Sequence, residues 1–197
     1  MTDRVVNRSE YPARHFLDHK NVTLEPWSEE WSSTFREDAK MLRRVLNSSN
    51  LVVNIHHVGS TSIQGLMAKP IVDIMMEVTS IEDFDKHRKV LEVAGYIWCG
   101  APFYGGRYLY NLHKADSGTV RSHLHVVESP MTQTSFALLQ FRDALRKDEK
   151  LLKEYARLKV KLAKDYSKPE ERHLYTQAKS AFVNSVVKNE QEKTNAT

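Results

Sequence analysis

Cysteine is nearly absent from this sequence of 197 residues, in which Cys99 is the only one. A single cysteine forms no disulfide within the chain and cannot assemble a cysteine-rich zinc site. The sequence also lacks any run of roughly 18 apolar residues that would span a membrane, and its charged N-terminal segment lacks the apolar core of a signal peptide. We therefore expect a protein of the reducing cytoplasm that is neither exported nor inserted into a membrane.

Internal repeats, low-complexity tracts and dense basic blocks are absent as well. The net charge is +4, and the basic surplus falls in residues 142–188, where acidic residues are interspersed. Such a surface can attract nucleotides or nucleic acid, although the solvated faces of amphipathic helices account for it more simply. Nucleic acid is therefore a permitted but unfavoured partner, and the sequence does not determine an oligomeric state.

The composition is that of a globular protein, with 41% hydrophobic and 27% charged residues. A chain of this length buries a sizeable core without disulfides. We expect one domain at residues 21–188, preceded by an extension at 1–20 and followed by a flexible polar tail at 189–197.

Hydrophobic periodicity predicts a chain of the α/β (α+β) class. Helical spacing of apolar residues indicates one helix before residue 46, one from Ser80 to Gly95 and three after Pro130. Short apolar or alternating runs indicate strands at residues 22–25, 51–58, 71–78, 96–98, 107–113 and 120–128. This order predicts a mixed sheet flanked by helices, with a C-terminal helical segment packed against it.

The first segment with recognisable chemistry is Gly59-Ser60-Thr61, which follows a predicted strand. A strand that enters Gly-Ser and then a helix start gathers free backbone N–H groups and the Ser60 hydroxyl around one point. Glycine lets a ligand approach the backbone closely, and the helix end adds partial positive charge. This pattern favours a phosphate site, and an ordinary turn is the alternative.

Asp73 lies within an otherwise apolar predicted strand. A carboxylate buried there without a partner would cost several kcal/mol, so it should meet a cation, hydrogen-bond donors or a metal. The alternative is a structural aspartate that holds a loop.

His123 and His125 alternate with apolar residues, so both imidazoles should project from one side of a strand. If that strand neighbours the Asp73 strand, an Asp–His–His cluster forms, which suits Zn²⁺, Mn²⁺ or Fe²⁺ better than Mg²⁺. Two alternatives remain open: one histidine acts as a general base or contacts phosphate, or both are half-buried structural residues.

Three cations are candidates to complete an anion site, namely Lys69, Arg107 and Lys179. Lys179 lies between Tyr175 and Phe182 on an apolar helical stripe, where a lysine should reach for a carboxylate or a phosphate. Each of the three can instead form a structural ion pair.

The run HHVGSTSIQGLMAKPIVDI resembles the signature of the GrpB-like proteins, a branch of the DNA polymerase beta-like nucleotidyltransferase superfamily. The segments LEPWSEEWSSTF, SHLHVVE, FRDALRKDEKLLKEYARLK and YTQAKSAFV extend the resemblance over residues 22–188. It implies a mixed sheet flanked by helices, with Gly59 and Ser60 at the phosphates of a nucleoside triphosphate. It also implies Asp73 as the first carboxylate ligand of a divalent metal.

The superfamily pattern has a second carboxylate two residues after the first, and this sequence has Met75 there. Position 75 shares a strand face with Asp73, but a thioether cannot replace a hard oxygen ligand of Mg²⁺. The resemblance implies Mg²⁺ or Mn²⁺ as the cofactor, and the two histidines add Zn²⁺ as a further candidate.

The resemblance implies nucleotidyl transfer, for which Asp73, His125 and Lys69 are the candidate catalytic residues. The expected ligand is a nucleotide or another phosphorylated small molecule. A binding module that has lost catalysis is the first alternative, and Met75 is its best evidence. A histidine-dependent phosphohydrolase is the second alternative, because His-Leu-His-Val-Val resembles part of the histidine-triad motif.

Overall fold

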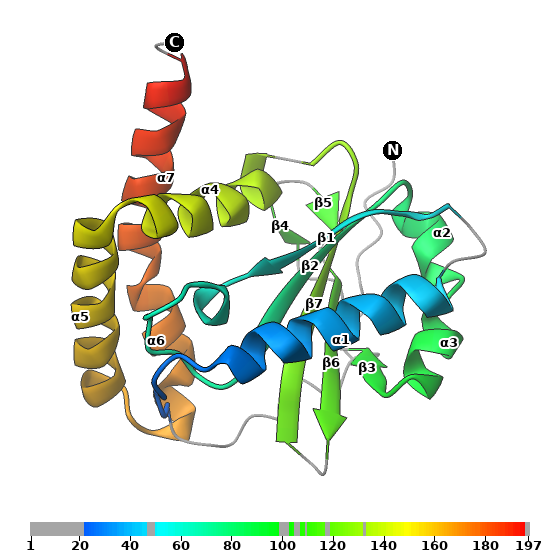
Figure 1. Ribbon diagram of the computed structural model, residues 1–197, viewed down its shortest axis with the longest axis horizontal. Coiled ribbons are helices and arrows are strands. Elements are labelled where there is room, and N and C mark those ends of the chain that lie inside the picture. The colour runs from blue at the N-terminus through cyan, green and yellow to red at the C-terminus, as the bar shows by residue number, and fades with distance from the viewer. Residues whose placement is uncertain are drawn as a thin grey trace.

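The computed structural model describes residues 22–46, 50–98, 103–104, 107–108, 110–116, 119–131 and 133–195. The extension expected at residues 1–20 lies outside this range. A central sheet carries helices, and the last four helices gather at one side of it, opposite α2 (Ile81–Asp85) and α3 (Arg88–Val93) (Figure 1). No helix in the described part is long and apolar enough to cross a membrane.

The main sheet has five strands in the order β1-β2-β7-β6-β3. β2 and β7 run parallel, whereas the β1–β2, β6–β7 and β3–β6 pairs are antiparallel. The mixed sheet that the sequence predicted is therefore confirmed. Its strands are β1 (Val52–Val58), β2 (Val72–Val78), β3 (Tyr96–Trp98), β6 (Tyr110–Asp116) and β7 (Thr119–Glu128), and a separate pair consists of β4 (Phe103–Tyr104) and β5 (Arg107–Tyr108).

Three of the helices begin at side-chain caps that the sequence supplies, Ser28, Ser80 and Asp148. Ser28 accepts a hydrogen bond from the Glu30 amide, and Asp148 accepts one from the Leu151 amide, which satisfies backbone donors in the first turn. The α-helices are α1 (Glu29–Val45), α2 (Ile81–Asp85), α3 (Arg88–Val93), α4 (Gln133–Lys147), α5 (Glu149–Asp165), α6 (Arg172–Ala178) and α7 (Ser180–Asn195), and the 3₁₀ turns are η4 (Ser60–Ser62) and η5 (Pro169–Glu171).

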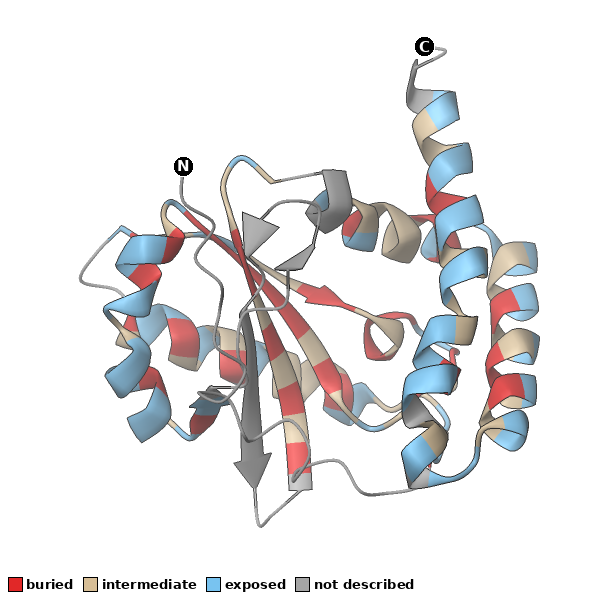
Figure 2. Ribbon diagram, turned by 180° about the vertical axis from the view of Figure 1, so that it is seen from behind, coloured by how far each residue is buried: buried red, intermediate tan, exposed pale blue. Residues whose placement is uncertain are grey.

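The two faces of the sheet have different surroundings, because successive strand residues point to opposite sides. Val72, Ile74 and Met76 belong to the largest core cluster, which also contains Leu42 of α1 and Phe84 of α2. α1 crosses this face in Figure 1, and Figure 2 shows the alternation of burial along the strands from the other side. Each large apolar side chain buried there contributes about 1.5–3 kcal/mol. The opposite face of β2 presents Asp73, Met75 and Glu77, and a smaller cluster with α4 covers part of it.

Several predicted elements differ in the structure. Residues 22–25 do not form a strand, because the segment makes only one bridge, between Glu25 and Ala68. The helix expected from Ser80 to Gly95 is divided into α2 and α3, since the amides of Lys86 and His87 bond three residues back instead of four.

The third C-terminal helix is likewise divided at Lys179 into α6 and α7. α7 continues to Asn195, past the point at residue 189 where we expected a tail. The strand predicted at residues 107–113 corresponds to β5 and most of β6.

Candidate anion-binding and metal site

Pairing of β2 with β7 brings the predicted carboxylate and imidazoles together. In the parallel register Asp73 lies opposite His123, and Met75 lies opposite His125. Asp73 Oδ1 is 3.1 Å from His123 Nδ1 and 3.5 Å from His125 Nε2. The expected Asp–His–His cluster therefore exists, with one potential ligand atom from each residue and all three atoms within 4.8 Å of one another.

The electrostatics of this cluster keep Asp73 ionised. Burial by itself would raise the pKa of Asp73, but hydrogen bonds from His123 and His125 hold that pKa well below its usual value. Nδ1 of His125 is buried and has no hydrogen-bond partner among the described residues. The cluster thus lacks the outer acceptor that usually orients a metal-bound histidine.

The Gly59-Ser60 bend lies directly against Asp73. Gly59 has φ 68° and ψ −173°, a conformation that favours glycine, and a Cβ at this position would lie 2.2 Å from Asp73 Oδ2. The helix start expected here is wrong, because residues 60–62 form one turn of 3₁₀ helix only. A single turn contributes less aligned dipole than an α-helix would, so charged side chains must supply more of any attraction for an anion.

Two arginines that sequence reasoning missed hold this bend from α4. Arg142 Nη1 donates to the His57 carbonyl at 3.0 Å, and Arg146 Nη2 donates to the Ser62 carbonyl at 2.6 Å. They attach the residues on both sides of Gly59 to one helix. Their spacing of four residues was visible in the sequence, but nothing in it indicated their backbone targets.

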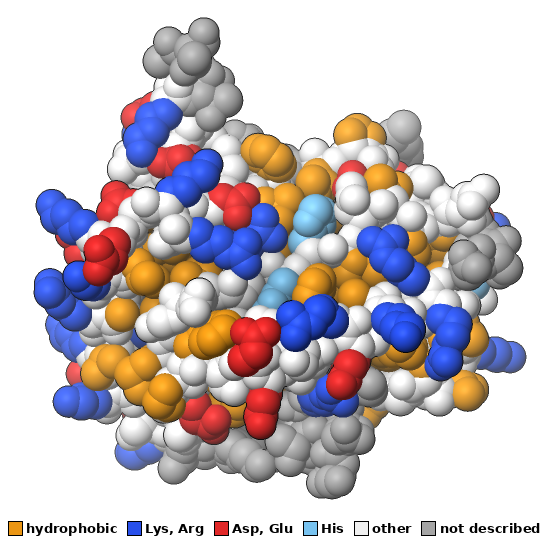
Figure 3. All heavy atoms as spheres, viewed as in Figure 1, with side chains coloured by type: hydrophobic (Ala, Val, Ile, Leu, Met, Phe, Trp, Pro, Cys, Tyr) orange, Lys and Arg blue, Asp and Glu red, His pale blue; other side chains and the backbone are white. Residues whose placement is uncertain are grey.

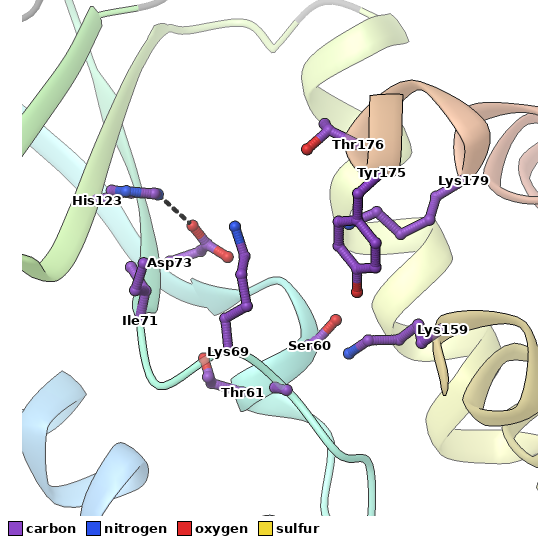
Figure 4. A pocket seen from close by; sticks show the side chains of 11 residues that line it. Ser60, Thr61, Lys69, Ile71, Asp73, His123, Lys159, Tyr175, Thr176 and Lys179 are labelled. Atoms are coloured by element: carbon purple, nitrogen blue, oxygen red, sulfur yellow. Dashed lines mark hydrogen bonds and ion pairs between the residues drawn. The ribbon is translucent and has the colours of Figure 1, made fainter. Parts of the chain in front are cut away.

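A cavity of about 230 Å³ opens beside the bend, between the sheet and helices α5 and α6. Figure 4 shows Asp73 and His123 on one side of it and Tyr175, Lys159 and Lys179 on the other. His125 and Gly59 are not among the residues that form its wall. That wall consists of Ser60, Thr61, Ala68, Lys69, Ile71, Asp73, His123, Lys159, Tyr175, Thr176 and Lys179.

Lys159 is the functional candidate that the sequence prediction missed. Only 2% of this residue is exposed, and its Nζ donates to the Met67 carbonyl. Burial lowers the pKa of Lys159 to about 7, with further lowering by Lys179 and Lys69 and a smaller opposite effect of Asp73. A signal was available in the sequence, because Lys159, like Lys179, is a lysine on an apolar helical stripe. It lies four residues after Tyr155 on the buried side of α5.

The other residues predicted to bind phosphate do not all line the same part of the site. Lys69 and Lys179 both reach the cavity, and Lys179 Nζ lies 4.3 Å from the centre of the Tyr175 ring. The Thr61 hydroxyl faces His57 Nε2 at 3.1 Å, on the α1 side of the bend. Arg107 opens β5, and its side chain lies outside the described part of the structure.

Met75 is fully buried at the position of the absent second carboxylate. It packs with Val58, Val127 and Leu139 in the apolar cluster between the sheet and α4. The space beside Asp73 that would hold a second metal ligand is therefore part of a core.

Comparison with known proteins identifies the family. A family model described as "GrpB protein" matches residues 21–189, which is most of the chain. The chain belongs to the GrpB family. The resemblance noted from the sequence is confirmed.

Individual GrpB relatives agree with this assignment. UPF0157 protein YqkA of Bacillus subtilis is 32% identical over 176 residues, covering 89% of this chain and 49% of the relative, so the chain spans about half of that protein. Glutamate-rich protein GrpB of Alkalihalophilus pseudofirmus is 32% identical over 168 residues, covering 84% of this chain and 94% of the relative. The crystal structure of conserved protein GrpB from Enterococcus faecalis matches with a TM-score of 0.76 and 29% identity, covering 87% of this chain and 98% of that one. The fold seen here is the mixed sheet flanked by helices that the resemblance implied.

Proposed function

We propose that this chain binds a phosphorylated small molecule in the cavity between β2 and helices α5 and α6. The observation that carries the proposal is the convergence of Lys69, Lys159 and Lys179, from three separate segments, on one cavity beside Ser60. A nucleotide is the ligand class that the family resemblance favours. Figure 3 shows basic and acidic side chains interspersed over the face seen in Figure 1, so the attraction for an anion comes from the cavity and not from a broad basic surface.

The charges of the cavity favour an anion. Three lysine side chains face one carboxylate, that of Asp73, around a cavity of about 230 Å³. Protonated lysines that share one partly desolvated cavity repel one another. An anionic ligand bound between them attracts each of the three and offsets that repulsion. Hydroxyl groups of Ser60, Tyr175 and Thr176 can donate hydrogen bonds to its oxygens.

We further propose that Asp73, His123 and His125 hold one divalent cation. One carboxylate and two imidazoles suit Mn²⁺ or Zn²⁺ better than Mg²⁺. Such an ion would supply positive charge for phosphate oxygens at the wall of the cavity. The chain's own groups then orient the ligand: Lys69 and Lys179 neutralise its charge, and the backbone at Ser60 approaches it closely.

Met75 favours a binding module over a two-metal nucleotidyltransferase. Two-metal phosphoryl transfer needs carboxylates that bridge both ions, and the second of these is replaced by a side chain of the apolar cluster. A histidine phosphohydrolase gains less support for two reasons. One ring nitrogen of each histidine, Nδ1 of His123 and Nε2 of His125, faces Asp73. In addition, His125 does not form part of the cavity wall.

Isothermal titration with a panel of nucleotides and sugar phosphates, with and without Mg²⁺, Mn²⁺ or Zn²⁺, tests the proposal. Product analysis of the same mixtures by mass spectrometry separates the two roles. Binding without turnover supports the module, and turnover supports transfer. If no phosphorylated compound binds under any metal condition, the proposed function is wrong.

Asp73→Asn is expected to weaken Mn²⁺ or Zn²⁺ binding by about 10- to 100-fold, because the neutral amide keeps the shape but loses the charge of the ligand. Titration calorimetry with the metal alone measures the change. Glu128→Gln, at the far end of β7, serves as the control and should bind metal as the wild type does. Equal metal affinity of Asp73→Asn and the wild type would show that the ion binds elsewhere.

A further inference from the structure

We infer that the cavity selects the dianion of a phosphate monoester and takes up a proton when that ligand binds, with Lys159 as the group that receives the proton. This inference rests on the proposed function, because it specifies the ligand class and the pH dependence of the same site. It follows from the size of the cavity, from its balance of charges and from the burial of one lysine.

The size of the cavity limits what it can enclose. Its volume of about 230 Å³ lies below the range of about 300–1,000 Å³ that is usual for pockets enclosing a whole ligand. A phosphoryl group fits inside, and the rest of the ligand must leave through the opening. A monoester has one substituent on its phosphate and can meet this condition, whereas a diester has two substituents that must both leave.

The charges agree with a dianion. In the metal-free protein, Lys69, Lys159 and Lys179 supply three positive charges when all are protonated, and Asp73 supplies one negative charge. The difference of two positive charges is matched by a monoester dianion and only half matched by a diester, which carries a single charge. His123 also forms part of the wall, where its Nδ1 donates a hydrogen bond to Asp73.

Lys159 differs from the other two lysines in its burial. Its Nζ donates to the Met67 carbonyl and lies 5.6 Å from the centre of the Tyr155 ring. The charged groups that influence it are Lys179 at the end of α6, Lys69 before β2 and Asp73 on β2. Tyr155 and Tyr175, the titratable hydroxyls nearby, stay neutral because burial raises the pKa of both.

The direction of the proton linkage follows from these surroundings. Without ligand the pKa of Lys159 is about 7, so this lysine is mostly neutral at pH 8. A bound dianion favours the ammonium form and raises that pKa, so binding takes up a proton. The affinity for the dianion therefore falls as the pH rises above 7, by roughly fivefold between pH 7 and pH 9 if the ligand raises the pKa by one unit.

The test compares a nucleoside monophosphate with its methyl ester, and includes inorganic phosphate, by calorimetry on the metal-free protein at pH 8 in two buffers of different ionisation enthalpy. At this pH a monoester is already a dianion, so any proton taken up comes to the protein. We expect the monoester and phosphate to bind with net proton uptake and the methyl ester to bind at least tenfold more weakly.

Three variants test whether Lys159 is the group that takes up the proton. Lys159→Met should abolish the uptake and the pH dependence, and Lys159→Arg should keep the binding but lose the pH dependence, because arginine stays charged. Lys161→Met, on the exposed side of α5, should behave like the wild type. Circular dichroism and thermal unfolding confirm that each variant is folded.

The outcomes separate the inference from the proposed function. The inference is overturned if the monoester and the methyl ester bind equally well. It is also overturned if the wild type takes up no proton, or if Lys159→Met takes up as much as the wild type. In each of these cases the proposed binding of phosphate still stands. Absence of binding by every phosphate compound from pH 6 to 9 overturns the proposed function, and the inference with it.

Discussion

Met75→Asp is expected to lower the free energy of unfolding by about 3–5 kcal/mol at neutral pH in the absence of metal. Met75 is fully buried against Val58, Val127 and Leu139. A carboxylate placed there loses its hydration among apolar side chains and lies between two other carboxylates, Asp73 and Glu77, on the same face of β2. His56 and His125 lie opposite position 75 in the neighbouring strands and offset only part of this cost. The change restores the superfamily pattern in the sequence and should still damage the protein.

Urea unfolding at pH 7 measures this loss, and Met75→Leu provides the matched control. Leucine conserves volume and polarity, so its cost should stay below about 1.5 kcal/mol. The cost of the aspartate should shrink as the pH falls through its raised pKa, because the neutral acid is easier to bury. Similar losses for the two variants, or full recovery of the aspartate variant on addition of Mg²⁺, would mean that the apolar cluster does not exclude a second carboxylate.

Gly59→Ala should be similarly damaging, with an expected loss of about 3 kcal/mol or more in the free energy of unfolding. The backbone at φ 68° and ψ −173° is strained for any residue with a Cβ, at about 1–3 kcal/mol. The new methyl group would also meet Asp73 Oδ2 at 2.2 Å, so either the bend or the carboxylate must move.

Gly65→Ala is the control that separates these two causes. Gly65 also has a positive φ, 81°, but a Cβ there would meet nothing within 4 Å. Its cost should be that of backbone strain alone, about 1–2 kcal/mol. Unfolding of the purified variants by urea gives both values, and equal losses would remove the contact with Asp73 from the explanation.

A double-mutant cycle tests the contact directly. With Ala at position 73 the oxygen that obstructs the new methyl group is gone, so Gly59→Ala should cost less in that background. The coupling between the two sites should lie at about 1 kcal/mol or above, within the range for residues in contact. Additive losses would show that the strain at Gly59 is independent of the carboxylate.

The sequence predicted much of the candidate site because the relevant signals are local. The alternation of side chains along a strand placed His123 and His125 on one face, and both do contact Asp73. The same alternation placed Met75 beside Asp73. A lysine on an apolar helical stripe indicated Lys179, and that residue does line the cavity.

The local signals also misled in places. Gly-Ser after a strand suggested a helix start, but the chain forms one 3₁₀ turn, and Arg142 and Arg146 of another helix bind the flanking carbonyl groups. Periodicity likewise did not reveal the breaks between α2 and α3 or at Lys179, since a stripe of apolar residues continues across a change in helix axis.

The sequence by itself determined the family, the order of most strands and helices, and which residues share a strand face. Only the tertiary structure decided that β2 lies next to β7 in the register that opposes Asp73 to His123, and that α5 brings Lys159 to the same cavity. The physical reason is the range of the interactions. Side-chain periodicity follows from neighbouring residues, whereas strand pairing and the burial of Lys159 depend on packing between segments far apart in the chain, where many registers satisfy the same local pattern.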